Sequence, residues 1–126
     1  MRLKFGAATD VGMVRQSNED AFSAEGELFI VADGMGGHNA GEVASALAVT
    51  TMKSGARNGL TEPSQFRELV QQANTAIYTA SLDDSAQSGM GTTVTALAVL
   101  PGEEPRVMVA NVGDSRTYVW RGGRLD

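Results

Sequence analysis

The sequence predicts an α+β fold, with strands near both ends of the chain and helices in its middle. Apolar or β-branched runs without helical spacing occupy the first and last thirds of the 126 residues. Between them, apolar residues recur at spacings of three, four and seven, which is typical of an amphipathic helix. A chain of this length fits one domain and can bury a core.

The first third of the chain contains two expected strands. Residues 3–8 form a short apolar stretch, and residues 27–32 form a run that reads as a buried strand. We expect this second strand to stop at Asp33 and Gly34. No repeat, low-complexity tract or linker interrupts the chain.

Two helices are expected in the middle of the chain. Asn39 and Glu42 have the spacing of a capping box, so the first helix would begin after Asn39 and stop near Gly55. Pro63 suits the first turn of the second helix. The apolar face of the first helix would carry Val43, Ala44, Leu47 and Ala48, and that of the second Phe66, Leu69, Val70, Ala73 and Ile77.

The last third contains three expected strands. Residues 92–100 and 106–112 are β-branched and are joined by a turn at 101–105. Residues 117–120 form a further strand, followed by a hairpin turn at 121–124. Only two residues follow that turn, too few for a returning strand. We therefore expect Trp120 to lie on an unpaired edge and the chain to stop inside a fold.

Composition and charge exclude several classes of function. The net charge is −5 and there is no basic stripe, which argues against nucleic acid as a partner. The chain has no cysteine, so disulfides, zinc–thiolate sites and a cysteine nucleophile are excluded. We expect no signal peptide, because residues 1–6 have no apolar core, and no apolar run approaches the ~20 residues of a spanning helix. We expect a cytoplasmic protein without membrane contact.

Acidic residues near the first strands form the main candidate site. Seven Asp and Glu stand against three Lys and Arg in residues 1–42. Glu19, Asp20 and Asp33 would share a site if a strand at 20–22 pairs with the strand that ends at Asp33. Clustered carboxylates raise one another's pKa unless a cation intervenes, and oxygen ligands suit magnesium, manganese or calcium. Spacing alone fits equally well a turn decorated by Glu19 and Asp20; the Asp-Gly strand end favours a metal.

Three further side chains each allow two interpretations. His38, the only histidine, follows two glycines in a loop before a helix N-terminus, where a proton donor could serve a bound anion. A lone histidine is more often structural. Arg15 could clamp phosphate or be an ordinary surface arginine. Asp114 fits a turn between strands or one more carboxylate ligand. The glycines at 34–37 lack the ending of a phosphate-binding P-loop.

Taken together, four ordered motifs resemble the bacterial metal-dependent Ser/Thr protein phosphatases of the PPM class (protein phosphatase type 2C). The resemblance covers essentially the whole chain. The motifs lie in residues 10–21 (DVG with Arg15 and NEDA), 31–42 (VADGMGGH and AGE), 90–93 (MGTT) and 110–116 (ANVGDSR).

The resemblance implies an α-β-β-α sandwich of two antiparallel sheets flanked by helices, incomplete at the C-terminus. Residues 1–126 would then be the N-terminal portion of a single phosphatase catalytic domain. The implied reaction is hydrolysis of phosphoserine and phosphothreonine by water activated by two Mn²⁺ or Mg²⁺ ions, with a weaker third metal site. The implied partners are phosphorylated substrates of bacterial Ser/Thr kinases and the missing C-terminal part of the same domain.

The resemblance also implies a role for each site residue. Asp33 would bridge both ions, Gly34 would lend its carbonyl, and Arg15 would bind the substrate phosphate. His38 would protonate the leaving alkoxide, although in many family members the histidine directly follows Asp-Gly. The implied metal residues are Glu19, Asp20, Asp33, Gly34 and Asp114, with Asp114 at the weaker site.

The family's later carboxylate motifs do not occur in this chain. We therefore expect the chain alone to have little or no phosphatase activity. Two other functions stay open. One is a non-catalytic phosphatase-fold module that binds a partner or phosphoprotein, and the other is a simple divalent-cation binding domain.

Overall fold

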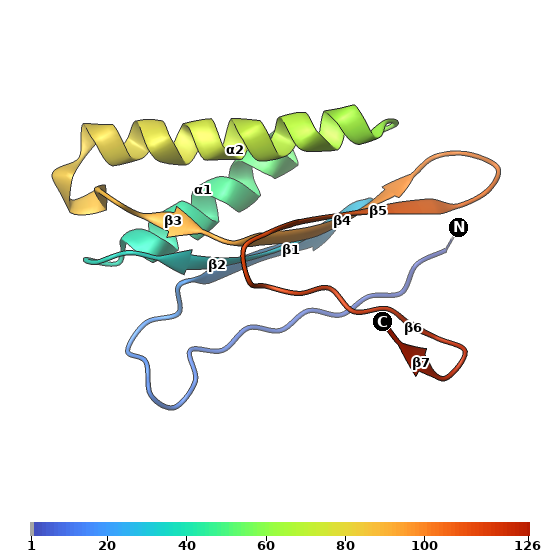
Figure 1. The fold of residues 1–126 in the computed structure, drawn as a ribbon, viewed down its shortest axis with the longest axis horizontal. Helices are drawn as coiled ribbons and strands as arrows, with labels where there is room; N and C mark the ends of the chain where they lie inside the picture. The colour runs from blue at the N-terminus through green and yellow to red at the C-terminus, as the bar shows by residue number, and fades with distance from the viewer. Residues whose placement is uncertain (1) are drawn as a thin grey trace.

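One antiparallel sheet with two helices on one of its faces makes up most of the structure, a computed structural model that describes residues 2–126. The strand order is β1-β2-β4-β5, and β3 pairs with the end of β2 in line with β4 (Figure 1). A separate hairpin, β6–β7, follows the sheet. The strands are β1 (Asp20–Glu25), β2 (Leu28–Met35), β3 (Gly91–Thr92), β4 (Val94–Leu100), β5 (Arg106–Val112), β6 (Trp120–Arg121) and β7 (Arg124–Leu125).

The β1–β2 hairpin places the acidic residues. Glu25 pairs with Leu28, so Gly26 and Glu27 form the turn, and Gly26 takes a φ of 62° that favours glycine. The predicted buried strand is confirmed, but its predicted stop at Asp33 is wrong. The strand continues to Met35 because β3 pairs with Gly34 and Met35.

The predicted strand at residues 3–8 is wrong, since these residues adopt no regular structure. They run past the sheet on the side away from the helices (Figure 1). The Phe5 ring packs edge-on against Phe29, with ring centroids 5.3 Å apart. Side-chain packing rather than strand pairing therefore holds this segment.

Both predicted helices are present, as α1 (Ala40–Gly55) and α2 (Pro63–Asp83), and a short 3₁₀ turn, η1 (Ser85–Gln87), follows them. The predicted capping box of α1 is wrong. Asn39 has a φ of 62° and makes no side-chain cap, because a capping residue needs extended backbone and this loop is left-handed. A capping box does open α2, between Glu62 and Gln65.

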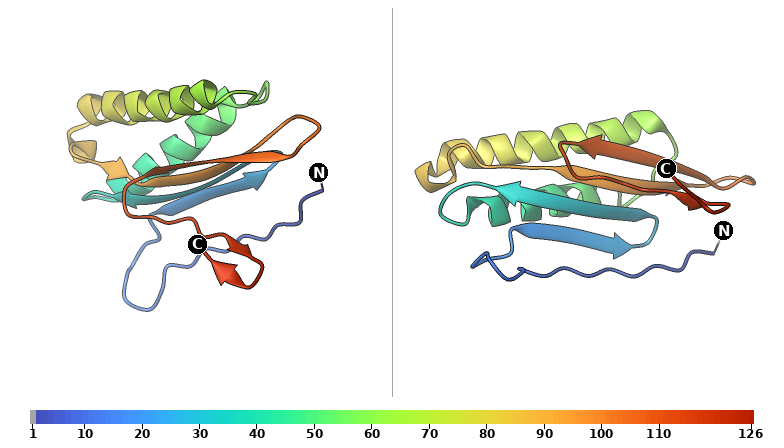
Figure 2. Two further views of the ribbon diagram at one scale, coloured as in Figure 1. Left: turned by 45° about the vertical axis from the view of Figure 1, so that its right-hand side comes forward. Right: turned by 60° about the horizontal axis from the view of Figure 1, so that its bottom comes forward.

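The core lies between the sheet and the helices, and the left view in Figure 2 shows both helices on the same side of the sheet. The predicted alanine face of α1 is confirmed for Ala44 and Ala48, which are fully buried; Val43 and Leu47 are half-buried. Small side chains allow α1 to lie close to β1 and β2. The buried face of α1 comprises Ala40, Gly41, Ala44, Ser45, Ala48, Val49 and Met52.

The opposite face of the sheet, termed the open face, is partly exposed. Phe22 and Val31 point to it with exposures of 41% and 50%. The predicted second sheet is not formed within residues 2–126, where only the β6–β7 hairpin is separate from the main sheet. Residues 117–119, part of a predicted strand, are irregular.

The prediction that Trp120 lies on an unpaired edge is wrong. Trp120 pairs with Leu125 in the β6–β7 hairpin. The backbones of Val119 and Asp126 also exchange two hydrogen bonds, of 2.6 and 2.8 Å. Two residues after the turn are enough because the backbone of Asp126 closes the ladder. None of the helices in the described part of the chain is long and apolar enough to cross a bilayer.

Candidate metal centre

Asp20 and Asp33 face each other as the pair at one end of the β1–β2 ladder. Directly opposed residues project their side chains to the same face of a sheet. Asp33 follows the alternation of Phe29 and Val31, so the two carboxylates lie at the rim of the open face. This pairing confirms the condition on which the predicted acidic site depended.

The environment of Asp20 raises the pKa of its carboxyl above the ordinary value. Partial loss of solvent around the carboxyl is the largest cause, followed by the negative charge of Asp33 and a hydrogen bond with the Asp33 side chain. Glu19 adds a smaller effect in the same direction, and the positive charge of Arg15 acts against it. The four charged groups therefore interact electrostatically.

Glu19 is fixed by its backbone immediately before β1. Its carbonyl accepts hydrogen bonds from the Gly34 N–H at 3.1 Å and from the Ser45 hydroxyl at 2.7 Å. Ser45 is fully buried on α1. The Glu19 carboxylate lies against Gly41, and a Cβ on Gly41 would collide with it. The contacts of Gly41 and Ser45 with Glu19 are not predicted from the sequence, although a serine between buried alanines on a helix face is a signal for such a contact.

The backbones of Gly34 and Gly41 also touch directly, and a Cβ on Gly34 would overlap the Gly41 carbonyl. The first turn of α1 therefore packs against the strand end that carries Asp33. Both glycines are required here because no side chain fits between the two backbones.

Arg15 belongs to an exposed loop that closes a hollow over the carboxylates. The hollow has a volume of about 360 Å³. We name it the acidic hollow. The side chain of Asn18 ties the loop to β1, because it accepts from the Asp20 N–H at 3.0 Å and donates to the Thr9 hydroxyl at 2.8 Å. The lining of the acidic hollow includes Asp10, Arg15, Glu19, Asp20 and Asp33.

Three of the predicted site residues do not line the acidic hollow. Gly34 is buried behind Asp33. His38 is exposed in the loop before α1, with a φ of 54°. Asp114 is exposed in the turn after β5. The structure therefore gathers Arg15 with the acidic residues but leaves the histidine and the last carboxylate outside.

The donor atoms in the acidic hollow suit a hard cation only in part. Two opposed carboxylates supply the oxygen ligands that magnesium and manganese prefer. Across residues 2–126, however, no three His, Cys, Asp or Glu side chains lie close enough together to hold an ion. An ion at this site would need water or donors from outside the described residues.

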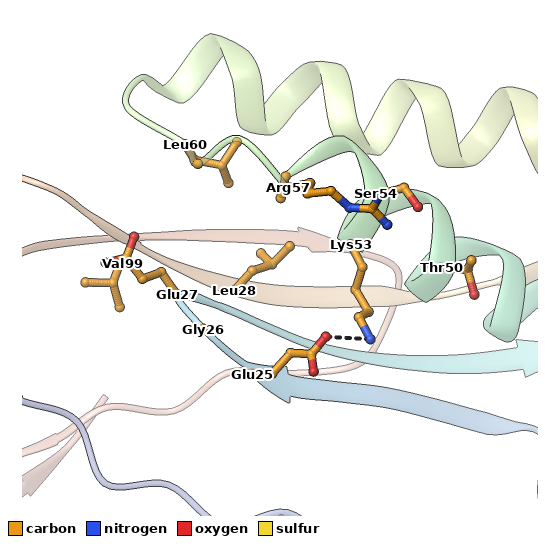
Figure 3. A pocket seen from close by; sticks show the side chains of 12 residues that line it. Glu25, Gly26, Glu27, Leu28, Thr50, Lys53, Ser54, Arg57, Leu60 and Val99 are labelled. Atoms are coloured by element: carbon orange, nitrogen blue, oxygen red, sulfur yellow. Dashed lines mark ion pairs between the residues drawn. The ribbon is translucent and has the colours of Figure 1, made fainter.

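A larger hollow, of about 590 Å³, lies at the other end of the β1–β2 hairpin (Figure 3). An ion pair of 2.6 Å between Lys53 of α1 and Glu25 of β1 spans it. Leu28, Leu60 and Val99 form its apolar floor. None of the predicted site residues lines it, whereas four of them line the acidic hollow.

The chain belongs to the protein phosphatase 2C family, and the family model matches residues 13–125. It is 38% identical to the serine/threonine protein phosphatase PstP of Mycobacterium tuberculosis, over 98% of this chain and 24% of that protein. It is 37% identical to the serine/threonine phosphatase Stp of Listeria monocytogenes, over 88% of this chain and 47% of that protein. The chain thus spans about half, or less, of the length of these relatives.

Solved structures share the fold. The catalytic domain of M. tuberculosis PstP, in complex with two manganese ions, matches with a TM-score of 0.80 and 37% identity, over 90% of this chain and 49% of that one. The Mycobacterium smegmatis phosphatase MsPP, in complex with cacodylate, matches with a TM-score of 0.80 and 39% identity, over 94% and 49%. The helices and the sheet therefore correspond to part of the phosphatase 2C fold.

Proposed function

We propose that this chain is the N-terminal portion of a single phosphatase catalytic domain that hydrolyses phosphoserine and phosphothreonine using two Mn²⁺ or Mg²⁺ ions. The observation that carries the proposal is the opposition of Asp20 and Asp33 beside Arg15, in a chain homologous to metal-dependent Ser/Thr phosphatases. Paired carboxylates bind cations, and a guanidinium beside them binds phosphate. The substrates would be phosphoproteins, chiefly those of bacterial Ser/Thr kinases.

The ions would supply an activated water, with its pKa lowered toward roughly 7, and would neutralise charge on the phosphoryl group. Asp33 would contact both ions from the end of β2. Glu19 would serve one ion, partly through water, Asp20 would order the surrounding water, and Gly34 would offer its carbonyl. Asp114, in the turn after β5, would hold the weaker third ion.

Arg15 and His38 would act on the substrate. The planar fork of the Arg15 guanidinium matches two phosphate oxygens. His38 would donate a proton to the leaving alkoxide. Because His38 lies in the exposed loop outside the acidic hollow, this role requires the loop to bring the imidazole to the substrate.

The complete domain would be an α-β-β-α sandwich in which a second sheet covers the open face. Two observations support this: the exposed apolar side chains of that face, such as Val31, and the greater length of the relatives. The ions would obtain their remaining carboxylates from that part. We therefore expect residues 1–126 alone to have little or no activity.

A non-catalytic phosphatase-fold module that binds a partner or phosphoprotein is the second candidate. It is favoured by one observation, the absence of three metal-ligating side chains in one place within residues 2–126. Under this alternative Arg15 would bind a phosphorylated partner without turnover.

The deciding experiment is manganese-dependent hydrolysis of an aryl phosphate and of a phosphoserine peptide. The chain is compared with an extended form, in which it continues past Asp126 to the length of its relatives. We expect turnover by the extended form and its loss in Asp33→Asn. An extended form that binds manganese but never turns over either substrate supports the module instead.

Two substitutions in the extended form test the substrate residues. Arg15→Ala should mainly raise KM, and an unchanged KM would remove Arg15 from the phosphate site. Replacement of His38 by Gln should slow aryl phosphates with poor leaving groups more than those with good ones, because only poor leaving groups need a proton. Equal slowing across the series would argue against a proton donor at this position.

A further inference from the structure

Thr93 lies at the junction of three segments of the structure. It is the single residue between β3 and β4, opposite the end of β2 that carries Asp33. The turn that carries Asp114 lies beside it, after β5. The sequence indicates only that Thr93 belongs to an expected strand and to the MGTT motif.

Thr93 brackets the backbone of Asp33 from both sides. Its N–H donates to the Asp33 carbonyl at 2.9 Å, and its hydroxyl accepts from the Asp33 N–H at 3.1 Å. The second of these bonds uses a side chain where a regular ladder would use a carbonyl. The orientation of the Asp33 peptide therefore depends on the Thr93 hydroxyl.

The same hydroxyl reaches the turn that carries Asp114. Thr93 Oγ1 and Ser115 Oγ lie 2.6 Å apart. Because Thr93 Oγ1 already accepts from Asp33, its own hydrogen is free to donate to Ser115. On the other side of Asp114, Gly113 has a φ of 99°, and a Cβ there would lie 2.7 Å from the Thr93 methyl carbon. Thr93 thus touches both neighbours of Asp114.

We propose that Thr93 is a positioning residue that fixes Asp33 and Asp114 relative to each other for divalent-cation binding. The inference rests on the proposed function, since it takes both aspartates as metal ligands. Groups that orient the ligands of a metal typically change its affinity 10- to 100-fold when they are removed. Because the Thr93 hydroxyl supports both Asp33 and Asp114, we expect a single substitution of Thr93 to change the affinity for the cation.

A second hydroxyl pair provides a matched control. Thr95 Oγ1 and Thr117 Oγ1 also lie 2.6 Å apart and join the same two segments, two residues farther along each. Thr95 makes no contact with Asp33 or with the Asp114 turn among the hydrogen bonds of residues 2–126. Loss of this pair removes a comparable bond between the segments without touching the aspartates.

The experiment measures Mn²⁺ binding to the extended form by calorimetry, with circular dichroism and urea unfolding as checks of folding. We expect Thr93→Val to raise the Kd for Mn²⁺ by about tenfold or more. Thr93→Ser, which keeps the hydroxyl, should stay within about twofold of wild type, and so should Thr95→Val. Ser115→Ala should weaken only the weaker manganese site, because Ser115 adjoins Asp114 and not Asp33.

Three outcomes would overturn the inference. One is a Thr93→Val variant with unchanged Kd, and another is an equal increase in Thr93→Val and Thr95→Val. The third is a wild-type extended form that binds no Mn²⁺, which would remove the proposed function as well. If Thr93→Val does not fold, Ser115→Ala takes its place, and an unchanged weaker site in that variant overturns the inference. If the wild-type extended form binds Mn²⁺ and turns over substrate while the Thr93 and Ser115 variants are unaffected, the inference fails but the proposed function stands.

Discussion

Asp20 and Asp33 are directly opposed in the β1–β2 ladder and form the end pair of that ladder. Two carboxylates on one face of a sheet repel each other, and cross-strand like charges destabilise a hairpin. The chain keeps this arrangement beside Arg15 in the acidic hollow. A bound cation would relieve this repulsion, so the opposed carboxylates fit a cation-binding role.

The first prediction concerns the pH dependence of stability without metal. The raised pKa of Asp20 means that the folded chain binds its proton more tightly than the unfolded chain does. This contribution to stability is complete below the ordinary pKa and is lost as pH rises through the raised value. In EDTA, the free energy of unfolding should therefore carry a component that falls with rising pH above about 4.

Asp20→Asn should remove this component and raise the free energy of unfolding near neutral pH by roughly 0.5 kcal/mol, the scale of a screened surface pair. Urea unfolding at a series of pH values measures it. Glu103→Gln, in the exposed β4–β5 loop, is the control and should leave the free energy of unfolding near neutral pH unchanged. Identical pH profiles for Asp20→Asn and wild type would contradict the prediction.

Ser45 supplies a buried hydrogen bond to the backbone of Glu19. We expect Ser45→Ala to lower the free energy of unfolding by about 1 to 2 kcal/mol, because a buried bond is lost and the Glu19 carbonyl keeps only one partner. Ser81→Ala is the matched control. The Ser81 hydroxyl also donates to a carbonyl at 2.7 Å, but on the exposed side of α2, so its loss should cost less than about 0.5 kcal/mol. Equal losses would show that Ser45 does not hold Glu19.

Gly41 separates α1 from Glu19 and Gly34. Alanine is normally favoured over glycine in a helix, yet we expect Gly41→Ala to destabilise the chain by about 1 to 3 kcal/mol, the range of an overpacked site. Gly37→Ala should be close to neutral, because a Cβ there has no atom within 4 Å. Chemical unfolding of the two variants makes the comparison, and a stabilised Gly41→Ala would refute the close approach.

Asn39 holds a left-handed backbone rather than a helix cap. Asn39→Ala should cost about 1 kcal/mol because an alanine Cβ disfavours this conformation, whereas Asn39→Gly should cost nothing measurable. A side-chain cap would be lost equally in both variants, whereas a left-handed backbone disfavours only the alanine variant. If glycine and alanine destabilise the chain equally, Asn39 contributes through its side chain and the left-handed assignment is wrong.

The parts of the fold that the sequence predicts depend on local signals. The end of α1 follows from Gly55 and the start of α2 from Pro63, signals that act within one turn of the helix end. The opposition of Asp20 and Asp33 is predicted only as a condition, because the turn at Gly26 and Glu27 that fixes the register falls partly inside the strand expected at residues 27–32. The two helix ends require no knowledge of distant partners.

The parts that the sequence does not predict depend on distant partners or on backbone angles. Residues 3–8 have strand composition but no strand pairs with them. Asn39 has the right spacing for a capping box, but the loop from Gly36 enters α1 in a left-handed conformation. Thr93 and Ser115 are 22 residues apart, and hydroxyl residues are common in strands and turns, so nothing in their spacing indicates contact.

The central claim is that Asp20 and Asp33 form part of a two-metal centre. Its most direct test is the stoichiometry of Mn²⁺ binding to the extended form, measured by calorimetric titration in wild type, Asp33→Asn and the control Glu25→Gln at the far end of β1. We expect two tightly bound ions in wild type and in Glu25→Gln, and loss of that binding in Asp33→Asn. Unchanged stoichiometry in Asp33→Asn, or no bound manganese in wild type, would contradict the claim.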